Sequence, residues 1–457
     1  MKSSKAATYS REHKIPELRF DDGESQKLTS FAGLIVYQKL FADLDLRKRL
    51  RDCFAHRRVE PIYGFHRIAL LLIIHVVLGY RKLRDRDFYD QDPMVLRTLG
   101  LKRLPDTSTI SRALKSVDRK SVDGMSTVMS DMVVDRLRVE RVRTLTLDFD
   151  GSVISTTRHA EGTAVGYNKM KKGRRSYYPL FCTVAQTGQF FDVLHRSGNV
   201  HDSNGSVSFV RSNMERAREI GPGMIIESRF DSAFFNEEML SDLDHEGAQF
   251  TASVPFERFT ELKRLVEERS RWCVIDGEWS YFECDWKPKK WDDKFRFIFV
   301  RRKNKKQISG PLQLDLFEPR SHEYAYKVIV TNKKIGAKKV LNFHNGRGEQ
   351  EGIFAEGKSN GLDYIPVKTW NGNRMYCLAV MMAHNLTREI QMRYQPKDRS
   401  TTEKRTPIWI FKTLDTIRQR VVQRAGRLVR PSGRLTLVMG GNLTVRKEIE
   451  KFMDGTG

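Results

Sequence analysis

The sequence predicts a mixed α/β fold that follows a helical N-terminal region. Residues 1 to about 140 are expected to form mostly helices, among them the 11-residue apolar run from Ile68 to Leu78. Another helix should begin near Pro105 to Ser108, where residues that favour helix starts cluster; it could read DNA or simply pack in a helical domain. From Arg143 polar and apolar residues alternate, which is typical of strands.

The elements expected after Arg143 follow a recognisable order. Thr144 to Asp150 alternates strictly, and Thr187-Gly188 should join two further strands, 178–185 and 189–195, in a hairpin. A helix, a strand, a helix and a strand are then expected at 206–220, 224–230, 236–245 and 249–254. This order is that of the ribonuclease H-like fold: three strands, a helix, a strand, a helix and a strand. The strand ends of that fold carry clustered carboxylates.

Five regions are predicted from this pattern. Residues 1–140 should form an N-terminal helical region that could bind DNA, and 141–254 the first part of the α/β core. Residues 255–321 form a β-rich insertion with four of the six tryptophans and the basic run from Arg301 to Lys306. Residues 322–400 complete the core with a strand at 323–331 and helices at 347–358 and 375–392, and 401–457 is a basic C-terminal region.

The charge of the chain indicates a polyanionic partner. Lys and Arg number 81 and Asp and Glu 57, which gives a formal net charge of +24. Nucleic acid is the leading candidate, and a merely soluble basic protein is the alternative. The polar start of the chain has no apolar signal segment, and the 11-residue apolar run falls short of the roughly 20 residues that span a membrane. Five scattered cysteines without C-x-x-C spacing support neither disulfides nor a zinc site, and a reducing cytoplasm fits.

Two strands are expected to end in carboxylates. Asp148 and Asp150 should share one face of the first strand with Thr144 and Thr146, while the apolar residues share the other face. Asp231 follows the strand at 224–230, and parallel strands gather such ends at one edge of a sheet. A divalent cation would neutralise neighbouring carboxylates. Each aspartate alone could instead accept hydrogen bonds from a loop.

A third carboxylate stands in a basic stripe. If a helix begins near Gly346, Glu351 lies about 40° and Lys358 about 20° from Arg347 around the helix axis. Glu349 and Glu356 then point elsewhere. An exposed, salt-bridged helix face explains this pattern as well as a metal and phosphate site does.

These motifs resemble those of the DDE transposases of bacterial insertion sequences. The third motif of one subgroup reads Y-x-x-R-x-x-x-E-x-x-x-x-x-x-K, and Arg347, Glu351 and Lys358 match it at that spacing, with His344 in place of the tyrosine. Residues 147–152 resemble the first motif and favour Asp150 over Asp148, and residues 229–235 resemble the second. Supporting segments are 178–180, 196–201 and 383–386, and the resemblance covers roughly Thr144 to Arg393.

The resemblance implies cut-and-paste DNA transposition in a bacterial cytoplasm, at the nucleoid. Asp150, Asp231 and Glu351 would hold two Mg²⁺ ions, for which Mn²⁺ can substitute, and would catalyse strand cleavage and transfer. His344, Arg347 and Lys358 would contact DNA phosphates. The partners would be double-stranded transposon ends and target DNA, bound by a homodimer, with no membrane.

Two alternatives and one further expectation accompany this interpretation. The chain could be a transposase-derived DNA-binding regulator without catalysis, which the intact acidic triad argues against. It could also be a ribonuclease H-like nuclease that hydrolyses without joining strands. Within the insertion, one tryptophan is expected to stack on an unpaired base, although for any single one of them the filling of a small β-rich core is the favoured alternative. The four candidates are Trp272, Trp279, Trp286 and Trp291.

Overall fold

The structure, a computed structural model, describes eight stretches of the chain: 27–59, 61–157, 159–166, 168, 171–200, 204–304, 324–399 and 404–453. Three parts of the sequence named above lie outside the described residues. They are the polar start of the chain, His201, and residues 305–321 of the predicted insertion, which include Lys305 and Lys306. No described helix is both long and apolar enough to cross a bilayer.

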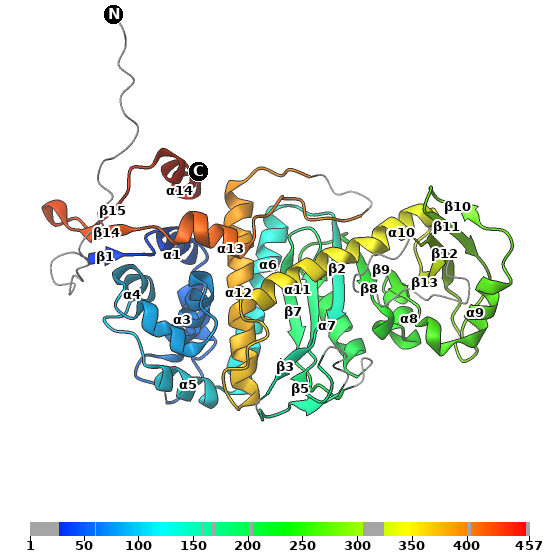
Figure 1. The fold of residues 1–457 in the computed structure, drawn as a ribbon, viewed down its shortest axis with the longest axis horizontal. Helices are drawn as coiled ribbons and strands as arrows, with labels where there is room; N and C mark the ends of the chain where they lie inside the picture. The colour runs from blue at the N-terminus through cyan, green and yellow to red at the C-terminus, as the bar shows by residue number, and fades with distance from the viewer. Residues whose placement is uncertain are drawn as a thin grey trace, which may run out of the picture.

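A nine-stranded sheet forms the centre of the molecule (Figure 1). Its strand order is β10-β11-β12-β13-β9-β8-β2-β6-β7, and β2, β8 and β9 run parallel while the other neighbours are antiparallel. The predicted mixed α/β fold is therefore confirmed. The strands are β2 Thr144–Gly151, β6 Leu180–Val184, β7 Gln189–Leu194, β8 Ile225–Phe230, β9 Gln249–Ser253, β10 Cys273–Val274, β11 Trp279–Glu283, β12 Arg296–Lys303 and β13 Tyr324–Thr331.

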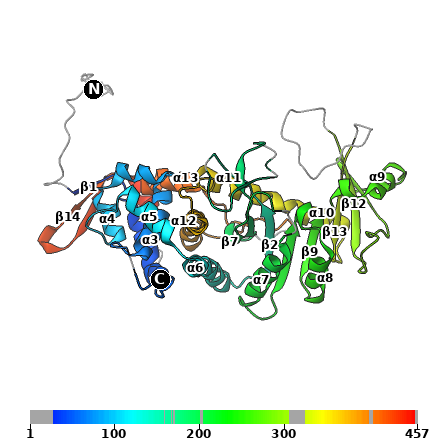
Figure 2. The ribbon, with the colours of Figure 1, turned by 90° about the horizontal axis from the view of Figure 1, so that it is seen from below.

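The two faces of the sheet carry different helices (Figure 2). One face packs on α6 Arg119–Val139, α7 Ser206–Arg218 and α8 Glu237–His245, and the other faces α10 Ala337–Asn345 and α11 Glu349–Ser359. Alternation along β2 explains this division, because Leu145, Leu147 and Phe149 enter the apolar core with α6 and α7. Asp148 and Asp150 consequently face the α10–α11 side, as the period of two predicts.

The long helix α12, Trp370–Tyr394, stands between the sheet and the N-terminal helices. One apolar core joins α12 to these helices, so the N-terminal region and the sheet share a continuous interior. The N-terminal helices are α1 Leu34–Asp43, α2 Leu46–Asp52, α3 Phe65–Leu78, α4 Pro93–Leu99 and α5 Thr107–Ser116. The two helices that the sequence predicts here, at 68–78 and from 105–108, correspond to α3 and α5.

The C-terminal segment returns to the N-terminal helices. After α12 it crosses the top of the sheet to α13, Leu414–Ile417, as Figure 1 shows. It then forms the hairpin β14 Gly426–Val429 and β15 Thr436–Met439, and ends in α14 Leu443–Met453. Strand β1, Lys27–Thr29, pairs with β14 and completes a small separate sheet.

The strands at 273–303 extend the central sheet, because β12 pairs with β13. One local feature differs from the sequence-based expectation. The helix expected to start near Gly346 begins at Glu349, after the separate helix α10 and a 3₁₀ turn at Gly346–Gly348. The two glycines of this turn interrupt what would otherwise be one helix.

Candidate active site

Asp150 and Asp231 lie at the ends of two neighbouring parallel strands. The last registered pair between β2 and β8 is Phe149 with Phe230, and each aspartate is the next residue. The Gly151 amide donates to Asp150 Oδ1 at 2.7 Å, and the Ala233 amide donates to Asp231 Oδ1 at 3.0 Å. The sheet thus brings both carboxylates to the edge where parallel strands end.

Asp148 is committed to a buried ion pair. It is 2% exposed, and its two carboxylate oxygens accept from Arg229 Nε at 2.5 Å and Arg229 Nη2 at 2.6 Å. The two residues are direct cross-strand neighbours in the β2–β8 pair. Arg229 also donates to the carbonyl oxygens of Phe343 and Lys404, at 3.1 and 2.7 Å. Asp148 is therefore held by Arg229 inside the sheet, whereas Asp150 lies at the strand end.

Two cations from the third motif surround Asp150. Arg347 Nη1 donates to Asp150 Oδ2 at 2.7 Å, and both side chains are largely buried. Lys358 lies near enough for the charges of Asp363 and Asp150 to act on it, although burial has the larger effect and lowers its pKa. Arg347 of the third motif therefore contacts a strand-end carboxylate directly, and Lys358 lies within reach of its charge.

Glu351 lies in the first turn of α11 and is exposed to solvent. Its neighbour Gln350 is 1% exposed and donates to the Asp148 carbonyl oxygen at 2.9 Å, which fixes the start of α11 against β2. Within the described residues, no three His, Cys, Asp or Glu side chains lie close enough together to hold a metal ion. The structure places Glu351 on the helix that faces Asp150 but does not gather the three acids into one cluster.

His344 is enclosed between α10 and β9. The ring is 1% exposed, and its nitrogens lie 3.0 Å from Ser253 Oγ and 3.0 Å from Thr251 Oγ1. Burial, with smaller contributions from Lys327, Arg347 and Arg229, holds the pKa of His344 well below its usual range. In this arrangement the ring anchors α10 to the sheet and is not presented to a phosphate.

The four tryptophans of the segment 255–321 are all half-buried. Trp272 packs edge-on against Phe282, and Trp286 edge-on against Phe297, at centroid distances of 4.7 and 4.9 Å. Trp291 stacks on Phe235 at 4.5 Å. Trp279 has the Arg302 guanidinium over its ring at 5.7 Å, and within the described residues it has no aromatic partner. Three of the four rings therefore pack against protein aromatics.

Tyr178 lies directly over Gly151. A Cβ added to Gly151 would meet the Tyr178 ring at 2.6 Å, so only glycine leaves room for this ring beside Asp150. The Arg196 guanidinium lies 5.2 Å from the ring centre and donates to the Tyr178 carbonyl oxygen at 3.1 Å. Two supporting segments of the sequence, 178–180 and 196–201, thus meet at the candidate site.

The remaining supporting segment, 383–386, has a structural role. The Asn385 side chain exchanges two hydrogen bonds with the Phe190 backbone, at 2.8 and 2.7 Å, and His384 Nε2 lies 2.8 Å from the Gly188 carbonyl oxygen. These contacts fix α12 to β7. The motifs do not reveal the structural roles of Arg229 and Gln350. For Arg229, a charge inside a predicted strand indicates that a partner must exist if the side chain is buried.

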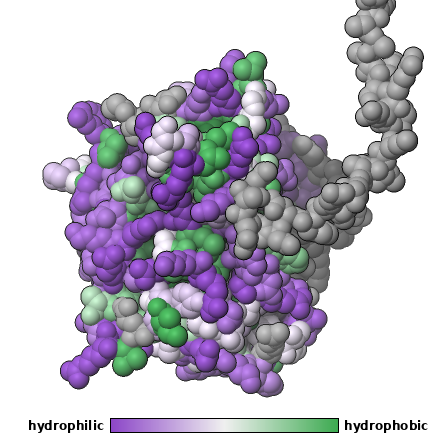
Figure 3. Space-filling model, turned by 90° about the vertical axis from the view of Figure 1, so that its left-hand side faces the viewer, coloured by the Kyte–Doolittle hydropathy of each residue, from purple (hydrophilic) through white to green (hydrophobic). Residues whose placement is uncertain are grey.

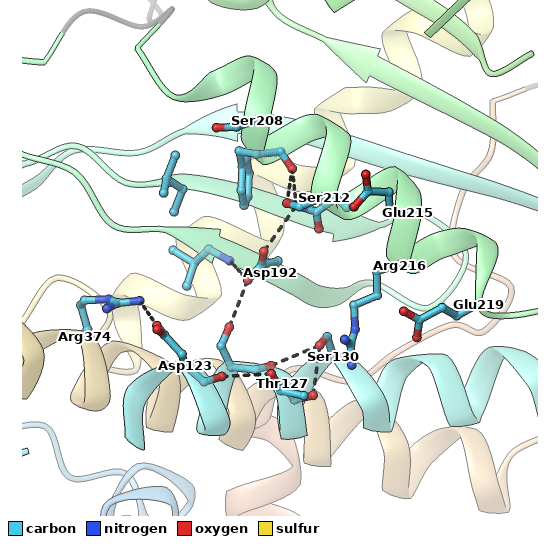
Figure 4. Close-up of a pocket in the computed structure, with 15 residues that line it drawn as sticks. Asp123, Thr127, Ser130, Asp192, Ser208, Ser212, Glu215, Arg216, Glu219 and Arg374 are labelled. Carbon is cyan, nitrogen blue, oxygen red and sulfur yellow. Dashed lines mark hydrogen bonds and ion pairs between the residues drawn. The ribbon is translucent and has the colours of Figure 1, made fainter. Parts of the chain in front are cut away.

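A cleft of about 590 Å³ opens between α6 and α7 above β7 (Figure 4). Asp192 lies at its floor and accepts from Ser126 Oγ at 3.0 Å. Burial raises the pKa of Asp192. None of the predicted site residues lines this cleft, so it is distinct from the strand-end carboxylates.

The strand order and the two aspartates at neighbouring strand ends define a ribonuclease H-like protein. A family model described as "Transposase DDE domain group 1" matches residues 16–455, and the chain belongs to this family of transposases. Among solved structures, the chain is similar to a piggyBac transposase in a synaptic complex with hairpin DNA. The identity is 13% and the TM-score 0.39, over 77% of this chain and 73% of that chain. None of the curated proteins matches the chain.

Proposed function

We propose that the chain is the transposase of an insertion sequence, of the subgroup whose third motif contains Arg, Glu and Lys. It would bind terminal inverted repeats and catalyse metal-dependent DNA cleavage and strand transfer by a cut-and-paste route. The observation that carries this proposal is the pairing of Arg347 with Asp150 at the end of β2, next to the strand end that carries Asp231. Membership of the DDE transposase family supports it.

The donor atoms at the strand ends fit a hard divalent cation. Asp150 and Asp231 supply carboxylate oxygens from adjacent strands, and Mg²⁺ prefers oxygen ligands, with Mn²⁺ as a substitute. Glu351 would supply the third carboxylate from α11. It lies about 20° from Lys358 around the helix, and Lys358 senses the charge of Asp150, so both face the same side. A pair of bound ions would activate the attacking oxygen and stabilise the leaving one.

Arg347 and Lys358 would bind and orient the DNA strand. The Arg347 guanidinium, which contacts Asp150 in the structure, would bind a DNA phosphate in a bidentate manner. The partly buried ammonium of Lys358 would act on the same strand as a point charge. The intact acids argue against a regulator without catalysis, and the basic residues beside them favour strand joining over simple hydrolysis.

The test is to replace each acid by its amide: Asp150→Asn, Asp231→Asn and Glu351→Gln. Each variant should lose cleavage of a duplex that carries the element's terminal repeats, because the metal loses a ligand. DNA binding should remain close to wild type, because affinity comes from Lys and Arg. Gel-based cleavage and binding assays with Mg²⁺ and with Mn²⁺ measure both properties.

Glu349→Gln is the matched control, because Glu349 lies in the same helical turn as Glu351. It should cleave DNA normally. Near-normal cleavage by any of the three amide variants would remove that residue from the site. A protein that binds the repeats and never cuts them, under any metal, would favour the regulator instead.

The proposed partner is double-stranded DNA, bound by a homodimer. For a chain of net charge +24, affinity should fall steeply with salt, because binding releases counterions from DNA. Light scattering of the DNA complex gives the stoichiometry. An affinity that barely changes between low and physiological salt would assign the charge to a different partner.

A base-stacking role remains a proposal for one tryptophan of the insertion, and Trp279 is the best placed of the four. Its ring lacks an aromatic partner among the described residues, whereas the other three are engaged by phenylalanines. Stacking would contribute about 1–3 kcal/mol per base. Trp279→Ala should then spare first-strand nicking and impair the later cleavage step, and Trp286→Ala should mainly lower stability. If Trp279→Ala matches the wild-type rate in both steps, the stacking proposal for Trp279 is wrong.

A further inference from the structure

The β14–β15 hairpin projects from the end of the molecule opposite β10 and β11 (Figures 1 and 2). Its strands join through a tight turn at Pro431–Gly433, in which Ser432 and Gly433 have positive φ angles of 52° and 80°. Arg430 and Arg434 flank this turn and are exposed, as is Arg427 on β14. The hairpin therefore holds three arginines out into solvent.

The charge of this part of the chain is entirely positive. Between residues 416 and 447 the sequence has no Asp or Glu and eight Arg or Lys. Within the described part of the chain, no carboxylate pairs with Arg427, Arg430 or Arg434. Some exposed arginines elsewhere do pair with acids: Arg211 pairs with Asp242, and Arg218 with Glu246 at 2.7 Å. The hairpin cations are thus left for an external anion.

The hairpin is anchored at its base. β14 pairs with β1 along three residues, and Leu437 and Met439 pack against the core of the N-terminal helices. A Cβ added to Gly426 would meet the Ala32 Cβ at 2.7 Å, so the base of β14 touches the start of that region closely. Because the strands are anchored in this way, the backbone that carries the three arginines needs little further ordering on binding.

One row of cross-strand neighbours lies on the outward face of the small sheet. Leu28, Arg427 and Val438 are neighbours across β1, β14 and β15, and the two apolar residues are 53% and 37% exposed. Figure 3 looks onto this end of the molecule, where hydrophilic residues cover most of the surface and hydrophobic ones form small separate patches. The face is therefore mainly polar and cationic, which fits a polyanion better than an apolar protein surface.

We propose that the β14–β15 hairpin binds the DNA phosphate backbone, at a site separate from the strand-end carboxylates. This rests on the proposed function in that the ligand is the same DNA. Arg427, Arg430 and Arg434 contact phosphates, and the contact is independent of base sequence.

The test is the triple variant Arg427→Gln, Arg430→Gln, Arg434→Gln, compared with a control that removes three other exposed arginines, Arg51→Gln, Arg58→Gln, Arg143→Gln. Both lose the same charge. Duplex affinity is measured at several salt concentrations, on terminal-repeat and on unrelated DNA. The hairpin variant should reduce the slope of log affinity against log salt by about 2–3, on both duplexes, because each lost phosphate contact lowers it by about 1. The control should change it by less than about 1.

Three outcomes would overturn the inference. Equal slopes for both variants would mean that only net charge matters, and an unchanged hairpin variant would mean that no contact exists there. A hairpin variant that alters the oligomeric state in light scattering, with unchanged DNA affinity, would make the face a protein interface. A wild-type protein that binds DNA with the expected slope but never cuts it would contradict the proposed function and leave this inference standing.

Discussion

Asp148 and Asp150 stand two residues apart on one face of β2, but their surroundings differ. Asp148 is enclosed with Arg229, whose side chain is 0% exposed, whereas Asp150 and Arg347 retain 18% and 13% of their side-chain exposure. A buried pair that loses one partner leaves an uncompensated charge, which costs far more than losing a pair near the surface. The two aspartates should therefore respond differently to the same substitution.

Asp148→Asn should destabilise the protein by about 3–5 kcal/mol, because Arg229 remains buried without its counter-charge. Asp150→Asn should change stability much less and abolish cleavage. Urea denaturation of both variants measures the first effect, and the cleavage assay the second. If Asp148→Asn folds with wild-type stability and has lost cleavage, Asp148 rather than Asp150 belongs to the metal site.

The sequence predicted the shared face of these aspartates, because side-chain alternation along a strand is a local property. It could not predict that Asp148 is the one buried against Arg229. That depends on the β2–β8 register, which places Asp148 beside a residue 81 positions later in the chain. His344 shows the same limit: its spacing fits the third motif, but its burial arises from contacts with Thr251 and Ser253 on β9.

At the scale of elements, the junction between α10 and α11 positions the third motif. Gly346 has helical backbone angles, φ −60° and ψ −17°, so its conformation would accept alanine. There is no space for an alanine side chain, however, because an added Cβ would lie 2.0 Å from the Lys404 carbonyl oxygen. The segment that contains Lys404 therefore packs directly against the turn that carries Arg347. Arg229 links this segment to α10, because it donates to the carbonyl oxygens of both Phe343 and Lys404.

Gly346→Ala should therefore displace α11 and lower cleavage at least about tenfold, with a stability loss of about 1–3 kcal/mol from overpacking. Gly348→Ala is the matched control, because Gly348 has similar angles and nothing within 4 Å of an added Cβ. It should keep full activity. Hydrogen exchange at the first amides of α11 reports the displacement independently of activity. Equal exchange in both variants would show that the contact with Lys404 does not position the helix.

At the scale of the whole molecule, buried histidines link stability to pH. Burial lowers the pKa of His75 and of His384 to about 4, and that of His195 to about 3. The unfolded chain titrates its histidines near pH 6.5. Between about pH 6.5 and 4 the unfolded state therefore binds protons that the folded state does not, so stability falls as the pH is lowered through this window.

When the pH is lowered from 7 to 5, each of these histidines should lower the free energy of unfolding by about 2 kcal/mol. His384→Gln tests one of them, because the glutamine amide can still donate to the Gly188 carbonyl oxygen that lies 2.8 Å from His384 Nε2. Near His384, Glu356 opposes the pKa shift and Arg388 adds to it, and both stay in place in the variant. Urea denaturation at pH 7 and pH 5 should show a smaller loss for His384→Gln than for wild type. An identical loss would mean that His384 does not take part.

The pairing of β1 with β14 has a consequence for how the protein is made. Lys27 pairs with Leu428, so the ribosome must add roughly 400 residues before the small sheet can close. At about 5–20 residues per second this takes about 20 seconds or longer, during which the N-terminal helices emerge without their last strands. The arginine hairpin is assembled only when nearly the whole chain, with both aspartate strands and α11, has been synthesised. A chain that ends before Leu428 would lack the β1–β14 pairing, and with it the DNA contact proposed for the hairpin.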